Sequence, residues 1–158
     1  MSISRVRFAG VVAVIVFALT GLADAAAPAG HYVVTAGSGT GNGTVYDTKS
    51  KLTWQQTASS TTYSWAGAQT YCAGVGTSLG GTGWRLPTYK ELYSIVDLSQ
   101  TTGPYIDPTA FPSASSGVFW SASPVAGSSS SAAWGVFFSL GSTYNYGVSA
   151  PFYVRCVR

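Results

Sequence analysis

One segment constrains the fold of this chain more than any other: residues 83–92, which read GWRLPTYKEL. Thr88 and Glu91 have the T-x-x-E spacing of a capping box, in which each side chain hydrogen-bonds the backbone N–H of the other residue. Pro87 cannot donate a backbone hydrogen bond and biases Leu86 toward an extended conformation. The segment therefore predicts a helix that begins at Thr88, reached by a sharp turn from a strand or loop.

The residues around this cap extend the prediction. Leu92, Ile95 and Val96 recur at helical spacing and give the helix one apolar face. Arg85, between Trp84 and Leu86, could bind an anion, but an arginine in an apolar setting more often pairs with backbone carbonyls or a carboxylate. We interpret the segment as structural, with Glu91 as the partner of the cap. The residues of this structural signature are Trp84, Arg85, Leu86, Pro87, Thr88 and Glu91.

The first 25 residues have the features of a signal peptide. Arg5 and Arg7 precede an uncharged run, residues 8–22, which is shorter than the roughly 20 residues of a membrane-spanning helix. Residues 23–25, ADA, give a cleavage site with A-x-A spacing. No cysteine stands at the processing site, and no second long apolar segment follows the run. We expect an exported chain without a membrane span after cleavage, with residues 26–158 as one domain.

The amino-acid composition suits a fold of short strands and argues against nucleic-acid binding. Charged residues make up 8% of the chain, against 19 glycines and 14% aromatic residues, which suits short strands and many turns. Without residues 1–25 the net charge falls to +2. Such dispersed charge does not form the dense basic stripe of a nucleic-acid-binding protein, so we expect no nucleic-acid partner.

The order of predicted elements indicates an α+β fold. Trp65, Ala68 and Cys72 fall on one face of a predicted helix over residues 62–72, with Thr62 or Ser64 as its cap. A glycine-rich connection, residues 74–83, leads to the second helix. The predicted strands are residues 31–35, 44–47, 52–55, 118–121, 133–140, 144–148 and 152–157. The second and third of these strands are predicted to form a hairpin around residues 48–51, although this turn lacks an Asn-Gly pair.

Alternation in the strand over residues 133–140 places four side chains on one face: Trp134, Val136, Phe138 and Leu140. Cys72 and Cys156 are the only cysteines, and an even count in an exported protein favours a disulfide over two free thiols. Closing a loop of about 85 residues would stabilise the fold by roughly 4 kcal/mol.

Several short motifs, taken in order, resemble the bacterial Lcl C-terminal domain family, named after a Legionella collagen-like adhesin. They are Tyr46-Asp47, Leu52-Thr53-Trp54, residues 65–72, residues 83–88 with Glu91-Leu92, Ile106-Asp107, Ala110-Phe111-Pro112, Phe119-Trp120-Ser121 and residues 153–158.

The resemblance implies a C-type-lectin-like fold, with two helices packed on small antiparallel sheets and one disulfide. In that fold a cysteine on the first helix, here Cys72, bridges to one on the last strand, here Cys156. Trp120 would lie in the core as part of the structural signature. The calcium motifs of sugar-binding C-type lectins are missing, so calcium-dependent sugar binding is not implied. The family's adhesin is associated with sulfated polysaccharide and with trimers, and the resemblance implies a bacterial chain in the periplasm, secreted or at the cell surface.

No catalytic or metal-binding set emerges from the residue types. A Ser-His-Asp triad would have to use His31, the only histidine, which lies near the predicted mature N-terminus. A zinc site needs three or four ligands, which one histidine and two bridged cysteines cannot supply. Asp97 and Asp107 could form a glycosidase pair, but a turn-forming role is commoner at a helix end and before a proline. Enzymes related to the lectin-like fold use a redox or copper-binding cysteine pair, and the large separation here favours a structural bridge. We expect a non-enzymatic protein without cofactor or metal.

Aromatic residues are the remaining candidates for ligand binding. Tyr144, Asn145 and Tyr146, with Trp134 facing them, could stack on sugar rings and hydrogen-bond sugar hydroxyls. We expect a binding or adhesion module that contacts an extracellular polysaccharide or a surface protein through loops between residues 103 and 143. The alternative is an assembly module that forms a homo-trimer or docks to a protein.

Overall fold

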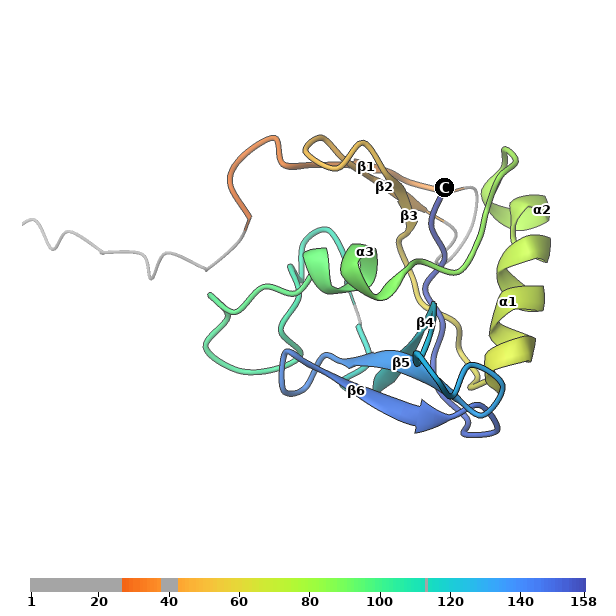
Figure 1. Cartoon of the computed structure of the whole chain (residues 1–158). Coiled ribbons are helices and arrows are strands. Elements are labelled where there is room, and N and C mark those ends of the chain that lie inside the picture. The colour runs from red at the N-terminus through yellow and green to blue at the C-terminus, as the bar shows by residue number, and fades with distance from the viewer. Residues whose placement is uncertain (1–26, 38–42, 113) are drawn as a thin grey trace, which may run out of the picture.

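The computed structural model describes residues 27–37, 43–112 and 114–158. The predicted signal peptide, residues 1–25, lies outside the described residues. Two three-stranded antiparallel sheets lie at opposite ends of the molecule, with one helix between them and another along one side (Figure 1). The fold is α+β, as predicted.

The described part of the chain has six strands and three helices. The first sheet has the order β1-β2-β3 and the second the order β4-β5-β6. The strands are β1 (Tyr32–Thr35), β2 (Thr44–Asp47), β3 (Thr53–Gln55), β4 (Val118–Pro124), β5 (Ala132–Phe137) and β6 (Ser142–Gly147). The helices are α1 (Trp65–Gly74), α2 (Gly76–Leu79) and α3 (Tyr89–Ser94). The sequence predicted two helices and missed α2, a single helical turn within the glycine-rich connection.

Helix α1 begins where the sequence predicted. The side chain of Ser64 caps it by accepting a hydrogen bond from the Gly67 N–H at 3.3 Å. Ala68 and Cys72 are fully buried on the inner face. Trp65 is half-buried at the first turn, where its Nε1 donates to the Ser121 carbonyl at 2.7 Å. These contacts hold α1 against β4.

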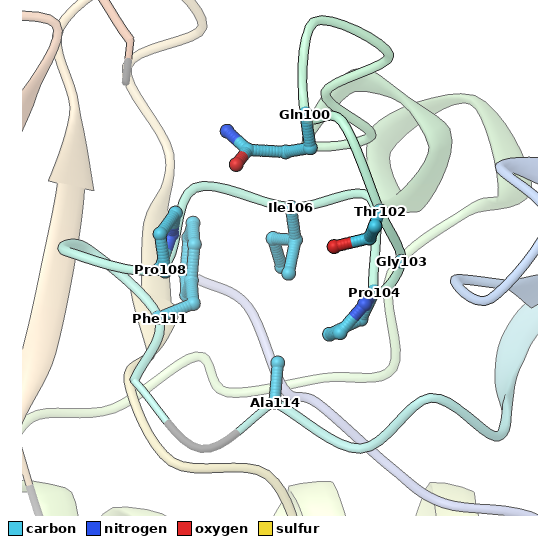
Figure 2. Close-up of a pocket in the computed structure, with 8 residues that line it drawn as sticks. All are labelled: Gln100, Thr102, Gly103, Pro104, Ile106, Pro108, Phe111 and Ala114. Carbon is cyan, nitrogen blue, oxygen red and sulfur yellow. The ribbon is translucent and has the colours of Figure 1, made fainter. Parts of the chain in front are cut away.

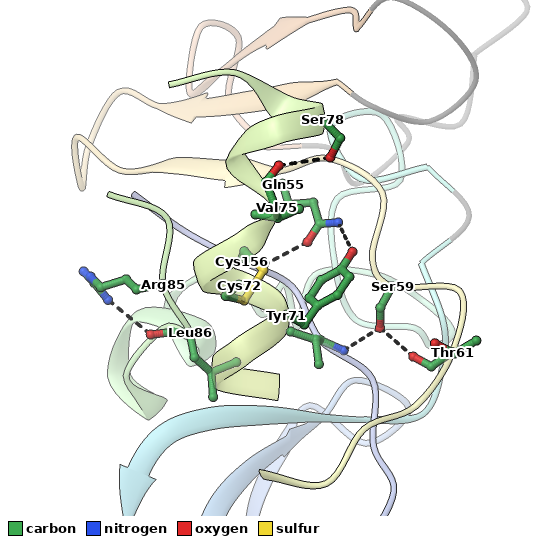
Figure 3. Close-up of a disulfide and its surroundings, with 11 residues drawn as sticks. Gln55, Ser59, Thr61, Tyr71, Cys72, Val75, Ser78, Arg85, Leu86 and Cys156 are labelled. Atoms are coloured by element: carbon green, nitrogen blue, oxygen red, sulfur yellow. Dashed lines mark hydrogen bonds between the residues drawn. A yellow bond between two sulfur atoms is a disulfide. The ribbon is translucent and has the colours of Figure 1, made fainter. Parts of the chain in front are cut away.

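The disulfide between Cys72 and Cys156 joins α1 to the terminal segment of the chain (Figure 3). Beside it, the buried side chain of Gln55 on β3 uses both ends of its amide. Its Nε2 donates to the Tyr71 hydroxyl at 2.8 Å, and its Oε1 accepts from the Cys156 N–H at 3.1 Å. The bridge and this amide together fix α1, β3 and the terminal segment to one another.

Helix α3 carries the predicted capping box of Thr88 and Glu91. Leu92 and Ile95 are buried, which confirms the apolar face. The regular helix ends at Ser94, so Val96 lies just beyond it and is half-buried.

Two predictions for the C-terminal half were wrong. β5 ends at Phe137, and a turn through Gly141, with φ +60°, returns the chain, so Leu140 is 57% exposed instead of sharing a buried face with Val136 and Phe138. Residues 152–157 do not form a strand. They make isolated bridges to Tyr63, Phe119, Arg85 and Trp54. The segment runs past several elements in turn, so no single strand pairs with it along its length.

Two apolar clusters form the core. One fills the space between the sheets beneath α3 and includes Val45, Trp54, Leu92, Phe119 and Val136. The other lies between α1 and the second sheet and contains both cysteines, with Trp84 and Trp120. Neighbouring residues Phe119 and Trp120 thus enter different clusters, because successive side chains of β4 point to opposite faces. No helix in the described ranges is long and apolar enough to cross a membrane.

Candidate functional site

The charged residues singled out from the sequence are engaged in structural contacts. Arg85 and Glu91 form an ion pair with a 2.7 Å contact, so Arg85 has the carboxylate partner expected of it. His31 contacts Asp47 at 3.1 Å and stacks on Tyr32, with the ring centroids 4.2 Å apart. Across the described residues, no cluster of three or more His, Cys, Asp or Glu side chains could hold a metal ion.

Asp97 and Asp107 line one small cavity of about 190 Å³, yet each carboxylate is committed to its own turn. Asp107 Oδ1 accepts from the N–H groups of Thr109 and Ala110, both at 2.8 Å. Its Oδ2 accepts from the Ala27 N–H at 2.8 Å. Asp107 therefore has the turn-forming role that its position before a proline predicts.

The carboxylate of Asp97 likewise accepts hydrogen bonds from residues of its own turn. Its Oδ1 accepts from the N–H and hydroxyl of Ser99, and its Oδ2 accepts from Gln100 Nε2 at 2.6 Å. Burial raises the pKa of Asp97, but these hydrogen bonds outweigh burial and hold the pKa below its ordinary value. A glycosidase acid needs the opposite, a carboxyl with a raised pKa. Asp97 therefore lacks the raised pKa that a glycosidase acid needs.

The four aromatic and polar residues predicted to bind a ligand do not share a surface. In the ladder between β5 and β6, Trp134 pairs with Asn145, while Gly135 pairs with Tyr144 and Ala133 with Tyr146. Directly paired residues lie on the same face of a sheet. Trp134 and Asn145 therefore lie on one face, and Tyr144 and Tyr146 on the other. Trp134 is half-buried near Tyr89 of α3, with ring centroids 6.0 Å apart.

Tyr144 and Tyr146 belong to an aromatic row that runs from the surface into the core. Their ring centroids are 6.4 Å apart, Tyr146 lies 4.6 Å from Phe152, and Phe152 lies 4.9 Å from Trp120. Tyr144 is 47% exposed at the outer end, and Trp120 is fully buried at the inner end. Trp120 Nε1 donates to the Tyr63 carbonyl at 2.8 Å, which fixes that ring. The row thus connects the exposed ring of Tyr144 to the buried core.

A separate cavity of about 350 Å³ opens in the long connection between α3 and β4, and we call it the loop cavity (Figure 2). Its apolar lining comes from Pro104, Ile106, Pro108, Phe111 and Ala114. The remaining lining consists of Gly103 and of the polar side chains of Gln100 and Thr102. The sequence analysis predicted ligand contacts in the loops between residues 103 and 143, a range that includes six of these eight residues, but it named none of them individually.

Arg155 is a further residue that the sequence prediction missed. It is fully buried, and burial lowers the pKa of its guanidinium to about 9. Its Nη1 donates to the carbonyls of Gln55 and Gln56, and the guanidinium lies over the Phe111 ring, 4.6 Å from the centroid. The Nε and Nη2 groups have no hydrogen-bond partner within the described residues. Arg155 fixes the terminal segment to the end of β3.

These features define a small disulfide-linked α+β module that exposes aromatic side chains at one sheet and a neutral cavity in one loop. The model of the Lcl C-terminal domain family matches residues 43–158, and the chain belongs to that family. Membership in this family suggests an adhesin-like module. A comparison with curated proteins found no match.

Proposed function

We propose that this chain is an exported, non-enzymatic adhesion module with a C-type-lectin-like fold, which binds polysaccharide without calcium. The proposal places it in the periplasm, outside the cell or at the surface of a bacterium. The observation that carries the proposal is the aromatic row, whose exposed Tyr144 rests on Tyr146 and, through Phe152, on the buried Trp120. A planar ring that is held rigidly can stack on the apolar face of a sugar with little loss of side-chain entropy.

The assignment of roles among the four predicted residues follows from their faces. Tyr144 and Tyr146 supply the stacking surface. Asn145 points to the opposite face together with Trp134, so these two belong to a different surface from the tyrosines. Tyr146 is half-buried, and burial and the neighbouring Tyr144 raise the pKa of its hydroxyl, so it stays a neutral hydrogen-bonding group.

Binding of the exported protein to immobilised cellulose, chitin and chondroitin sulfate, each with and without EDTA, tests the proposal. We expect retention on at least one polysaccharide in the presence of EDTA. Tyr144→Ala should weaken that binding about three- to tenfold, since one aromatic contact is worth roughly 0.5–1.5 kcal/mol beyond its buried area. Tyr93→Ala is the matched control, because Tyr93 is 40% exposed and lies on α3, outside the aromatic row. Binding to none of the three polysaccharides would exclude the proposal.

A second candidate function, assembly into a homo-trimer or onto a surface protein, has one observation in its favour. Among the described strands, β1 lies at the edge of its sheet beside β2, and its Val33 and Val34 are 50% and 43% exposed. An exposed edge with apolar side chains is suited to pairing with another chain. Light scattering on the ligand-free exported protein separates the candidates. A stable trimer that Val34→Lys dissociates favours assembly, and a monomer at all concentrations contradicts it.

A further inference from the structure

The loop cavity has an uncharged lining, unlike the two described cavities that include Asp107. None of its lining residues is ionisable, whereas the cavity beside His31 includes Lys49, Asp97 and Asp107. A ligand that depends on ion pairs would find no partner there. The chemistry of the lining therefore selects an uncharged ligand.

The walls of the loop cavity are apolar and firmly held. Ile106 and Phe111 are 2% and 0% exposed, and both belong to the core cluster beneath α3. Tyr105 N–H donates to the Phe138 carbonyl at 2.8 Å, which ties the loop to the turn after β5. A Cβ built on Gly103 would lie 2.9 Å from the Ser139 carbonyl oxygen, so the loop packs closely against that turn. The cavity is thus preformed, as small-molecule sites usually are.

Polar groups lie at the rim of the cavity. Figure 2 shows the Thr102 hydroxyl beside Ile106 and the Gln100 side chain above the opening. Gln100 Nε2 donates to Asp97 Oδ2 at 2.6 Å, so its orientation is fixed. An apolar floor with a neutral polar rim complements a ligand that has a small apolar group beside hydroxyl or amide groups.

We infer that the loop cavity binds the acetamido group of an uncharged N-acetylated sugar, with the methyl against the accessible apolar lining of Pro104, Pro108 and Ala114 and the hydroxyls at Thr102 and Gln100. This inference rests on the proposed saccharide recognition but names a different site from the aromatic row. A peptide fits less well. Peptides commonly add a strand to an exposed sheet edge, and the lining residues lie in a connection without strands. The cavity volume of about 350 Å³ is near the lower end of typical ligand sites, which suits a single sugar.

The test uses calorimetric titration of the exported protein with three probes: chitotriose in its fully N-acetylated form, cellotriose and N-acetyl-leucinamide. Chitotriose and cellotriose differ mainly in the acetamido groups. We expect chitotriose to bind at least about tenfold more tightly, because a preformed pocket discriminates a missing group by that order. Equal affinity for the two trisaccharides would overturn the acetamido assignment. N-acetyl-leucinamide carries an acetamido group but no sugar ring. Its binding without any binding of chitotriose would show that the cavity does not select a saccharide, and would overturn the inference.

Two pairs of matched variants locate the binding. Ala114→Leu fills the cavity, and we expect at least a tenfold loss of chitotriose affinity, while Ala126→Leu, at an exposed turn, should change nothing. Thr102→Val should weaken binding two- to fivefold, and Thr101→Val should not. Thr102 is exposed, so this pair keeps the test valid even if Ala114→Leu fails to fold. Chitotriose affinity that is unchanged in both cavity variants would overturn the inference.

The assignments of the two binding sites can be rejected independently of each other. If Tyr144→Ala weakens polysaccharide binding but the cavity variants do not affect chitotriose, only the loop cavity assignment is wrong. If the cavity variants weaken chitotriose binding and Tyr144→Ala has no effect on binding to any polysaccharide, the assignment of the aromatic row is wrong and the assignment of the loop cavity is kept. If no saccharide binds, both are wrong.

Discussion

Arg85 and Glu91 face each other with two parallel hydrogen bonds. Arg85 Nη1 donates to Glu91 Oε2 at 2.8 Å, and Nη2 donates to Oε1 at 2.7 Å. The same Oε2 accepts from the Thr88 N–H at 2.8 Å, so one carboxylate completes the capping box and holds the arginine. The backbone of Arg85 also pairs with Val157 in both directions. The segment before α3 is therefore a junction between the helix and the end of the chain.

Glu91→Gln should make the chain less stable at neutral pH and remove part of its acid sensitivity. Hydrogen bonding from Arg85, with smaller contributions from Thr88, lowers the pKa of Glu91 from 4.5 to about 2. A carboxyl with a lowered folded-state pKa adds stability that is complete above about pH 4.5 and is lost as the pH falls toward 2. Arg85 is nearly half exposed, so solvent reduces the effect to about 1 kcal/mol.

Urea unfolding at pH 7, 4 and 2 measures this effect. The difference between wild type and Glu91→Gln should shrink as the pH falls and vanish near pH 2. Lys90→Gln is the control, because it alters one charge at an exposed neighbouring position without touching the ion pair. A difference that stays constant from pH 7 to 2 would show that the charge of Glu91 does not contribute.

Removing the disulfide should destabilise the fold more than any of the single substitutions. Cys72 and Cys156 are 84 residues apart in sequence and both are fully buried. The double variant Cys72→Ala/Cys156→Ala should lose roughly 4 kcal/mol of unfolding free energy, because the unfolded chain regains the entropy of an open loop. Urea unfolding of the wild type with dithiothreitol should give a similar midpoint. A loss below about 1 kcal/mol would show that the bridge adds little.

Local sequence signals predicted the parts of the fold that are determined locally. The Thr88–Glu91 capping box, the Ser64 cap and the β2–β3 hairpin each depend on residues within a few positions of one another. The hairpin turn lacks an Asn-Gly pair, yet Asp47 holds it by accepting from the Lys49 N–H at 2.8 Å. These features follow from backbone chemistry alone.

The prediction failed where distant segments decide the structure. Residues 152–157 alternate like a strand, but their partners come from four different places in the chain. The faces of Trp134 and Tyr144 depend on the register between β5 and β6, where Trp134 pairs with Asn145. The loop cavity and the burial of Arg155 likewise arise from long-range packing, for which no short motif exists.

Two neighbouring glycines provide a matched test of the contact between Arg158 and Trp84. Gly80 and Gly81 have φ of +73° and +75°, which strains any other residue. A Cβ at Gly80 would meet nothing within 4 Å, whereas one at Gly81 would lie 2.2 Å from Arg158 Nη1. The Arg158 guanidinium lies over Trp84, 5.2 Å from the ring centroid.

Gly80→Ala should lower the unfolding free energy by about 1–3 kcal/mol through backbone strain alone. Gly81→Ala should add a displacement of Arg158, at a cost of up to about 1 kcal/mol for an exposed cation–π contact. Urea unfolding measures the two losses. Displacement of Arg158 should also change the tryptophan fluorescence of the folded Gly81→Ala protein but not that of Gly80→Ala. Identical spectra for the two variants would contradict a role for the contact.

Two substitutions of the buried Arg155 separate the effect of its shape on stability from the effect of its charge. Arg155→Met replaces the buried cation with an apolar chain of similar length, and Arg155→Lys keeps the charge as a compact, strongly hydrated ammonium. Since the structure places no carboxylate partner beside this position among the described residues, desolvation penalises the lysine. We expect Arg155→Met to be more stable than Arg155→Lys by about 1–2 kcal/mol in urea at pH 7.

The pH dependence of the two Arg155 variants supplies the second measurement. Burial lowers the pKa of a lysine below its ordinary value, so above that lowered value the unfolded state binds more protons than the folded state. The stability of Arg155→Lys relative to Arg155→Met should therefore increase between pH 7 and pH 10. If the lysine variant is instead the more stable one at pH 7, the attraction between a positive charge and the Phe111 ring outweighs the cost of desolvating that charge. The planar stacking of the guanidinium would then contribute less to stability than its charge does.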